Sequence, residues 1–482
     1  MGNLGIIVYV QKQLLMLEAA FFALGRHIVS ILQSINGILW GIPVIMLIIT
    51  VGVMLTIRTR AAQIRLFPTA FSQLLRSFRE RKRDDQSFGS YRSLCTALAA
   101  TVGTGNIAGV AGAIALGGPG VVFWMWLCAI LGMIIKLAEV MLAMRYRRKD
   151  SVNGYIGGPM YMIENGLPRR LHFLAVLYSC FGVVAALGVG NATQINAVTD
   201  GIERIAHSFH LPYNNMIRIA IGLAAAIVLF FVFCQGTIKI GQLAEGLIPF
   251  ASLAYILLAV LLILLRIRHL PASIHAILIG AFQPKAITGG MLSSFFLTVR
   301  IGVSRGIFTN EAGMGTASIA HASTQTDVAL AQGLMGIIEV FLDTIIICTL
   351  TALVILCSGI KIPYGTDPGI LLTLDSFSSI LGNWSSILVT ALVCLFAFAT
   401  ILGWGLYGGR CCQYLFGDSG WKYFVIAQSL AVILGSSLKT SVIWEFSELV
   451  NGLMAIPNLT AIVLLCSNFV QILRESENAY RL

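Results

Sequence analysis

The sequence predicts an all-α polytopic membrane protein with eleven transmembrane helices, ten of which form two five-helix halves of opposite orientation. Three observations lead to this prediction. The chain of 482 residues is 57% hydrophobic and only 11% charged. Apolar runs of about 18 or more residues, each long enough to span a membrane, recur along it. Glycine-interrupted motifs occur at corresponding places in the two halves of the chain.

The first predicted crossing is residues 37–57, and a loop with eight Lys and Arg residues between Arg58 and Arg83 follows it. Because short cytoplasmic loops carry an excess of Lys and Arg, we expect this loop inside the cell and the N-terminus outside. Residues 1–35 are only moderately apolar, which is typical of a peripheral or interfacial helix. They lack the basic start and small-residue cleavage site of a signal peptide.

Ten further crossings are predicted from the remaining apolar runs. Their approximate bounds are 90–117, 121–145, 172–206, 215–234, 240–266, 292–320, 329–358, 383–415, 422–437 and 441–468. Alternation places loop 146–171 and the C-terminus in the cytoplasm, in agreement with the basic residues at both ends of that loop. The basic stretch at 266–269 falls outside and departs from the rule. The two longest runs exceed the roughly 20 residues that a helix needs, so we expect tilt or extension beyond the bilayer.

These crossings predict five parts of the chain. They are a peripheral segment 1–35, an extra transmembrane helix with its basic loop 36–89, a first five-helix repeat 90–285, a second inverted repeat 286–468, and a cytoplasmic tail 469–482. The net charge of +11 lies mainly in short loops, so no nucleic-acid partner is expected. The ten cysteines lie mostly inside apolar runs and are interpreted as small apolar residues.

The two predicted halves share three features in register. "TVGTGNIAGVA" begins at Thr101 and "NEAGMGTASIAHA" at Asn310, and each carries a Gly-x-Gly in mid-run. "AEGLIPFASL" and "VNGLMAIPNL" place a proline in the last helix of each half. The third feature is a charged pair, Lys136 and Glu139 in one half and Glu339 and Asp343 in the other. Since five crossings is an odd number, the repeats must be inverted.

Glycines are concentrated where the first repeat begins. Residues 100–113 contain Gly103, Gly105, Gly109 and Gly112, and each costs about 0.8–1.0 kcal/mol relative to alanine in a helix interior. A helix broken there frees backbone amides that can hold an anion and carbonyls that can hold a small cation. The pattern therefore predicts a transporter's binding site at the bilayer midplane, where Gly103 and Gly105 must remain glycine. Close helix packing is the alternative reading, and Gly105-x-x-x-Gly109 fits it.

Charged residues inside predicted crossings are candidates for function. They are Lys136, Glu139, Glu245, Arg305, Glu311, Glu339 and Asp343. An ion pair of Lys136 with Glu139 or Glu339 is the favoured structural reading, and Arg305 and Glu311 are expected to shape the second break. His321 is interpreted as a helix-end residue, with proton sensing as the alternative. The sequence shows no metal-ligand cluster and no nucleophile beside a base, so we do not expect an enzyme.

At these motifs the chain resembles the alanine or glycine:cation symporter family of the amino acid–polyamine–organocation superfamily. The resemblance covers about 36–468 and is carried by "SLCTALAATVGTGNIAGVAGAIALGGPGVVFWMW", "GGPMYMIENGL", "SRGIFTNEAGMGTASIAHA", "EVFLDTIIICT" and "GWGLYGG". It implies the leucine-transporter fold with one extra N-terminal helix. It also implies a symporter of the prokaryotic plasma membrane, the inner membrane where there are two, that imports alanine or glycine with Na⁺ or sometimes H⁺.

The resemblance also implies a set of site residues. Those expected to bind substrate are Thr101, Gly103, Thr104, Gly105, Asn106, Gln194, Asn310, Ala312, Gly313 and Trp404. Those expected around the cation are the carbonyls near Ala99 and Val102, together with Ala397 and the hydroxyl of Thr400. Gln194 and Trp404 lie in the middle of the third helix of each half, although a lone intramembrane Gln or Trp more often serves packing. Arg410 stands where many members carry an acidic residue.

The predicted function is secondary active symport of a small neutral amino acid, with Na⁺ as coupling ion and no other cofactor. Alanine, glycine and serine stay open as substrates, as do D or L preference, stoichiometry and oligomeric state. The alternatives are an H⁺-coupled transporter and a non-symporting channel or receptor, and a channel would need a ring of identical filter elements. Neutral oxygens around Thr400 favour Na⁺, because a threonine hydroxyl does not titrate near neutral pH. Glu311, Glu339 and Asp343 are the candidates for proton coupling.

Overall fold

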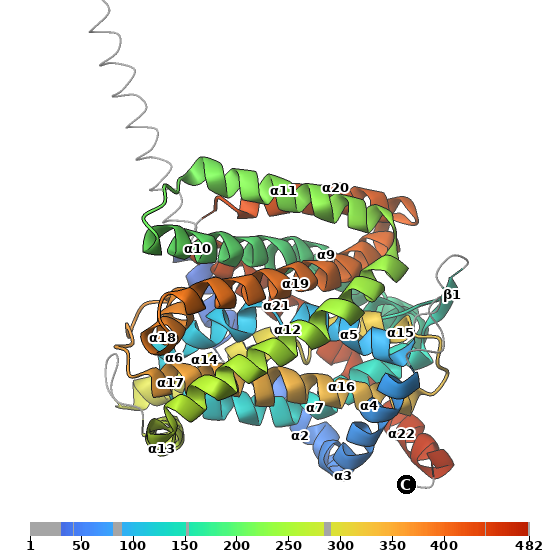
Figure 1. The fold of residues 1–482 in the computed structure, drawn as a ribbon. Coiled ribbons are helices and arrows are strands. Elements are labelled where there is room, and N and C mark those ends of the chain that lie inside the picture. The colour runs from blue at the N-terminus through green and yellow to red at the C-terminus, as the bar shows by residue number, and fades with distance from the viewer. Residues whose placement is uncertain are drawn as a thin grey trace, which may run out of the picture.

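The computed structural model describes residues 30–41, 43–80, 89–150, 154–283, 291–438 and 440–480, and these are almost entirely helical. Strands β1 (Arg148–Asp150) and β2 (Gly154–Ile156) form a short antiparallel hairpin with Lys149 opposite Tyr155. Most of the predicted peripheral segment 1–35 lies outside the described residues. The helices pack side by side in one bundle, with α13 and α18 at one end and β1, α4 and α22 at the other (Figure 1).

The first half contains a broken helix followed by four longer ones. Its elements are α5 (Ser90–Thr101), η2 (Thr104–Asn106), α6 (Ala108–Gly117), α7 (Val121–Arg145), α8 (Pro159–Gly166), η3 (Arg169–Leu171), α9 (Phe173–Leu187), η4 (Gly188–Ala192), α10 (Thr193–Ser208), α11 (Asn215–Cys234) and α12 (Thr237–Leu265). The chain bends by 55° between α5 and the segment that begins at Thr104. The predicted run 172–206 forms one long helix with a π-helical turn, η4, in its middle.

The second half repeats this order. Its elements are α14 (Met291–Asn310), α15 (Thr316–Ala322), α16 (Ala329–Val340), the π-helical η6 (Phe341–Cys348), α17 (Thr349–Ser358), α19 (Trp384–Phe416), α20 (Ser419–Gly435) and α21 (Thr440–Leu464). Between or beside the repeats lie η5 (Ile267–His269), α13 (Leu270–Phe282) and α18 (Leu371–Leu381). The prolines of the two matching motifs, Pro249 and Pro457, lie inside α12 and α21, as the repeat predicts.

Two terminal parts flank the repeats. An apolar helix over Ser30–Arg58, which includes α2 (Pro43–Arg58), packs against α7 and α21. Short helices α3 (Ala62–Arg65) and α4 (Phe67–Glu80) follow it. Most of the segment predicted as a tail, 469–482, belongs to helix α22 (Cys466–Tyr480), which only Leu465 separates from α21. An ion pair of 2.7 Å joins Arg65 to Glu477 of α22.

The described helices confirm most predicted crossings. Eight are long and apolar enough to span a membrane, and the bent pair of α5 with η2 and α6 makes a ninth. The predicted crossings 292–320 and 422–437 do not meet this criterion, since the first is divided between α14 and α15 and helix α20 has only 17 residues. The expected total of eleven is therefore not confirmed.

The outer faces of α11 and α12 support a membrane environment. Phe231, Phe250 and Leu257 are more than half exposed there, which is unfavourable in water for so many large apolar side chains. The interior is formed by α19, which packs against α5, α9, α10 and α12, and by α7, which packs against α14 and α16. This arrangement places the two broken helices at the centre of the bundle.

Candidate functional site

The first helix break begins where α5 ends, at Thr101. Val102 (φ −81°, ψ 91°) and Gly103 (φ −141°, ψ −154°) are extended, and the chain then turns through η2. In a continuous helix the amide of Gly103 would donate to the carbonyl of Ala99. It donates instead to Oδ1 of Asn106 at 2.9 Å. The carbonyl of Ala99, which the family resemblance assigns to the cation, therefore does not receive its usual helical hydrogen bond from Gly103.

Gln194 of α10 holds the next residue of the break. The amide and hydroxyl of Thr104 both donate to Oε1 of Gln194, at 3.3 and 2.9 Å. The other end of this side chain is fixed, because its Nε2 donates to the carbonyl of Val189 in η4 at 3.0 Å. A π-helical turn offsets the side chains that follow it, and here it directs Gln194 toward the break.

Thr400 of α19 approaches the break from the opposite side. A Cβ on Gly103 would collide with Oγ1 of Thr400 and lie 3.3 Å from Oε1 of Gln194. Thr400 is buried, and its hydroxyl has no hydrogen-bond partner among the described residues. Backbone contact also joins the two helices, since a Cβ on Gly403 would lie 2.6 Å from the amide nitrogen of Ala100. Space, rather than a left-handed backbone, is what requires glycine at 103.

The remaining residues expected around the cation and the substrate are buried nearby. Ala99, Val102 and Ala397 are each at most 1% exposed, and Ala397 lies one turn before Thr400 on α19. Trp404, one turn after Thr400, is fully buried and packs so closely on η4 that a Cβ on Gly190 would overlap it. No described group accepts a hydrogen bond from its indole nitrogen.

Gly105 differs from Gly103. A Cβ there would make ordinary contacts of 3.4 Å with the ring of Phe308 and 3.8 Å with Thr309. The sequence predicts that both positions require glycine, but the geometry supports that requirement only at Gly103. The same contacts place Phe308 and Thr309 of α14 against the first break, which sequence reasoning missed.

Asp343 of η6 connects the two breaks through hydrogen bonds. Asn106 donates to Oδ1 of Asp343 at 2.6 Å, and the hydroxyl of Thr344 donates to Oδ2 at 2.8 Å. Asn310, at the end of α14, donates to the hydroxyl of Thr344 at 3.1 Å. A buried carboxylate therefore lies one side chain away from the first break. The sequence marks Asp343 as an intramembrane acid but does not place it there.

The second break, residues 311–315, is closed by a carboxylate of the protein itself. Glu311, Gly313 and Gly315 all have positive φ, from 55° to 95°. The amides of Gly313 and Gly315 donate to Oε1 of Glu139 on α7, at 2.8 and 3.0 Å. Asn458 of α21 donates to the same oxygen at 2.7 Å and to the carbonyl of Gly313 at 2.9 Å.

The substrate residues expected at this second break are therefore already bonded within the protein. The amide of Gly313 donates to Oε1 of Glu139, and the amide of Ala312 donates to Oδ1 of Asn310 at 3.0 Å. Asn310 is connected to the first break through Thr344 and Asp343, which bonds to Asn106. Thr101, on the other side, lies at the end of α5 with its hydroxyl bonded to the carbonyl of Ala97.

A buried ionic chain lies beside the second break. Lys136 pairs with Glu339 at 3.2 Å, which confirms the interhelical ion pair that the sequence favours. The other oxygen of Glu339 contacts Nε2 of His321 at 3.1 Å, and Gln332 contacts Nδ1 at 2.5 Å. His321 thus lies in the last turn of α15, as the sequence predicts, and is buried there between two partners.

Arg305 of α14 contacts a different set of residues. Its guanidinium lies 3.8 Å from Asp367 and 3.8 Å from Glu448, and stacks 5.1 Å from the ring centre of Trp444. The sequence predicts that Arg305 shapes the second break, but these partners lie before α18 and on α21. Glu448 was missed, although it is an acid within a predicted crossing and the rule that selects Glu339 also selects it.

Comparison with known proteins gives one consistent result. The model of the sodium:alanine symporter family matches residues 26–481. The sodium/alanine symporter AgcS of Methanococcus maripaludis is 37% identical over 441 residues, which cover 91% of this chain and 94% of that protein. The probable sodium/glutamine symporter GlnT of Bacillus subtilis is 36% identical over 447 residues, which cover 91% of this chain and 88% of that protein.

One solved structure shows the fold. The crystal structure of MhsT in complex with L-phenylalanine matches with a TM-score of 0.59 and 15% identity, over 78% of this chain and 88% of that one. At this identity the likeness concerns the fold alone, which is leucine-transporter-like as the sequence predicts.

Proposed function

Since this chain belongs to the sodium:alanine symporter family, a family of sodium-coupled multi-pass transporters and not of enzymes, we propose that it imports a small neutral amino acid together with Na⁺ by alternating access. Alanine is the proposed substrate, with glycine and serine as the nearest alternatives. The proposed location is the bacterial plasma membrane, with the N-terminus outside and the C-terminus in the cytoplasm.

The observation that carries this proposal is the buried hydroxyl of Thr400, which faces Gly103 and has no hydrogen-bond partner within the described parts of the chain. Leaving a buried hydroxyl unpaired costs about 1–3 kcal/mol, and a cation held by neutral oxygens would remove that cost. The carbonyl of Ala99 lacks its helical donor at the same place. Together with carbonyls near Val102 and Ala397, these oxygens fit a hard monovalent cation.

The two breaks differ in what they can offer to an amino-acid carboxylate. At the first break the amides of Gly103 and Thr104 bond to neutral side-chain oxygens of Asn106 and Gln194. A substrate carboxylate can replace these, because an anion is favoured at freed backbone amides. At the second break the amides already bond to the carboxylate of Glu139, which would repel a second anion. We therefore assign the substrate carboxylate to the first break.

Side-chain selectivity is assigned to Trp404 and Phe308. Trp404 is buried against η4, and Phe308 covers Gly105. Trp404 lies against Gly190 and Phe308 against Gly105, and in this proposal the two rings limit the substrate side chain to a methyl or hydroxymethyl group. The relative GlnT is described as a probable sodium/glutamine symporter, so differences in side-chain volume around the site are the proposed basis of substrate choice within the family.

Proton coupling is the second candidate, and one observation favours it. Asp343 contacts Asn106 directly, so a titratable group adjoins the proposed site. Under this alternative Asp343, or the chain of Glu339 and His321, would carry the coupling proton.

The test is uptake of labelled L-alanine into proteoliposomes that contain the purified chain. An inward Na⁺ gradient should drive accumulation, and an inward proton gradient in sodium-free buffer should not. Excess glycine and serine should compete, whereas glutamine should compete weakly. Accumulation without Na⁺ that an uncoupler abolishes would transfer the coupling role to Asp343 or Glu339. Strong competition by glutamine with none by glycine would overturn the substrate assignment.

A further inference from the structure

Helix α4 carries three separate stripes. One stripe, with Ala70 and Ser77, is buried and belongs to the side that packs on α16. A second stripe is apolar but exposed, since Phe71, Leu75 and Phe78 retain 50%, 47% and 46% of their surface. A third stripe is polar and exposed and contains Ser72, Arg76, Arg79 and Glu80. A helix that packs on the protein with one side has no reason to expose an aromatic stripe to water.

The position of α4 accounts for the two exposed stripes. It lies between the apolar helix that ends at Arg58 and helix α5, at the end of the bundle that also carries β1 and α22 (Figure 1). An interfacial helix places its apolar side among the acyl chains and its basic side at the phosphate level. The order of stripes on α4 matches that environment at the membrane surface.

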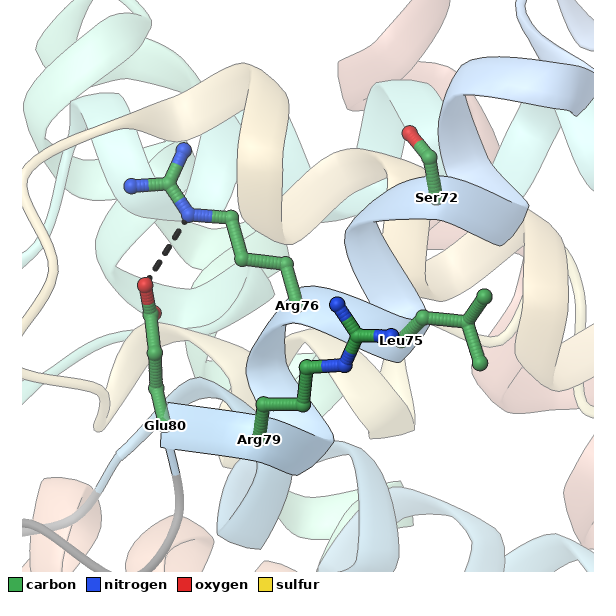
Figure 2. Close-up of a pocket in the computed structure, with 5 residues that line it drawn as sticks. All are labelled: Ser72, Leu75, Arg76, Arg79 and Glu80. Carbon is green, nitrogen blue, oxygen red and sulfur yellow. Dashed lines mark hydrogen bonds and ion pairs between the residues drawn. The ribbon is translucent and has the colours of Figure 1, made fainter.

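Two hollows adjoin the exposed side of α4. A shallow one of about 400 Å³ is lined by Ser72, Leu75, Arg76, Arg79 and Glu80. Figure 2 shows these side chains and the contact from Arg76 to Glu80, which measures 3.0 Å. A second hollow of about 260 Å³, an almost entirely apolar crevice between α4, α5, α12 and η6, also begins at Leu75 and extends to Val102 at the first break. Leu75 lines both.

We propose that α4 and this crevice bind one anionic phospholipid, from the cytoplasmic leaflet in the orientation assigned above. Its phosphate lies between Arg76 and Arg79, with the hydroxyl of Ser72 as a further donor, and one acyl chain enters the crevice at Leu75. Guanidinium groups suit phosphate oxygens because their donors are arranged in a planar fork. The exposed Arg76–Glu80 pair is no obstacle, since such pairs contribute little.

The juxtaposition of the two hollows selects a phospholipid over a soluble anion. A free phosphate would contact only the arginines and would not fill the crevice. A neutral lipid would fill the crevice but would bring no negative charge to the arginines. The acyl chain would contact α5 from Tyr91 to Val102. Because Val102 is the first residue of the helix break, the bound lipid would also affect the transport site, and uptake should depend on the headgroup.

The test uses the full-length protein with phosphatidylglycerol as the probe. Lipid retention is measured by native mass spectrometry after titration, and alanine uptake is compared in vesicles of phosphatidylcholine alone and with one part in five phosphatidylglycerol. Basic residues near an anionic membrane surface contribute about 1 kcal/mol each. The double variant Arg76→Gln/Arg79→Gln should therefore bind the lipid about 30-fold more weakly and lose the stimulation of uptake by phosphatidylglycerol, while it keeps its uptake in phosphatidylcholine.

Two controls separate this site from general surface charge. Arg169→Gln/Arg170→Gln removes the same charge from exposed positions in η3 and should leave retention unchanged. Ser252→Phe, on the α12 wall of the crevice, should weaken retention although no charge is lost. Equal loss in the η3 control, or full retention in the α4 variant, would overturn the proposal. Displacement of the lipid by inorganic phosphate, with no effect of Ser252→Phe, would indicate a free-anion site and also overturn it.

Discussion

Replacing Gly103 by alanine should damage the site far more than the same replacement at Gly105, two residues away. A Cβ on Gly103 collides with Oγ1 of Thr400, and Gln194 lies 3.3 Å away on another side. At Gly105 the nearest atom is 3.4 Å away, in the ring of Phe308. Neither glycine has positive φ, so the comparison isolates space from backbone conformation.

The magnitude follows from the cost of overpacking. An extra carbon in a well-packed interior typically costs about 1–3 kcal/mol, and α5 cannot retreat easily because Ala100 is in backbone contact with Gly403. If the strain falls on the cation and substrate geometry, affinity drops by about 5-fold to 150-fold, at tenfold for about 1.4 kcal/mol. At Gly105 the same reasoning predicts a change below about threefold.

The assay is the half-saturating concentration of Na⁺ and of alanine for uptake, measured beside thermal stability for both variants. Gly103→Ala/Thr400→Ala should regain thermal stability, because the colliding atom is gone, but should not regain Na⁺ affinity, because the hydroxyl is gone too. Equal effects of Gly103→Ala and Gly105→Ala would refute the geometric argument and leave helix packing as the role of both glycines.

Three further outcomes are expected. Thr400→Ala should raise the half-saturating Na⁺ concentration roughly tenfold, because a polar contact to a charge contributes about 1.5 kcal/mol, and should leave the thermal midpoint unchanged. An unaltered Na⁺ dependence would place the ion elsewhere. Trp404→Leu should admit valine and leucine in competition assays while wild type excludes them, and an unchanged side-chain preference would remove Trp404 from the pocket. Glu139→Ala should destabilise the protein by about 2–6 kcal/mol in denaturation experiments, because two backbone amides lose their acceptor at about 1–3 kcal/mol each; a variant as stable as wild type would contradict the role of Glu139 in closing the second break.

The helices themselves were predictable because apolar length is a local property. Predicted crossings 121–145, 215–234 and 329–358 coincide with the helix bounds of the structure. The glycines at 103 and 313 mark both breaks, since a broken helix needs residues without a side chain or with positive φ. Helix α22 was not foreseen, because its sequence mixes polar and apolar residues and the helix packs on α7 and α16, far away in the chain.

The site was predictable only in part, because its hydrogen bonds join residues far apart in the chain. Gln194 and Thr400 were expected near the first break from the family resemblance, and the structure brings both to Gly103. The bond of Asn106 to Asp343 and the closure of Gly313 by Glu139 depend on how α7 and η6 pack. No local pattern in the sequence encodes these contacts, nor the room beside Gly105.

Because of the hydrogen bonds to Glu139, the two helix breaks differ in how firmly they are held. One carboxylate ties α7, α15 and α21 together through three donors, so these helices behave as a clamped assembly at that point. The amides of the first break donate to the neutral side-chain oxygens of Asn106 and Gln194, and such bonds are weaker than bonds to a carboxylate. Although the two halves of the chain match, the second break is therefore held more tightly than the first. Motion that opens the site should pivot at Gly103, with the assembly of α7, α15 and α21 around Glu139 as its stationary frame.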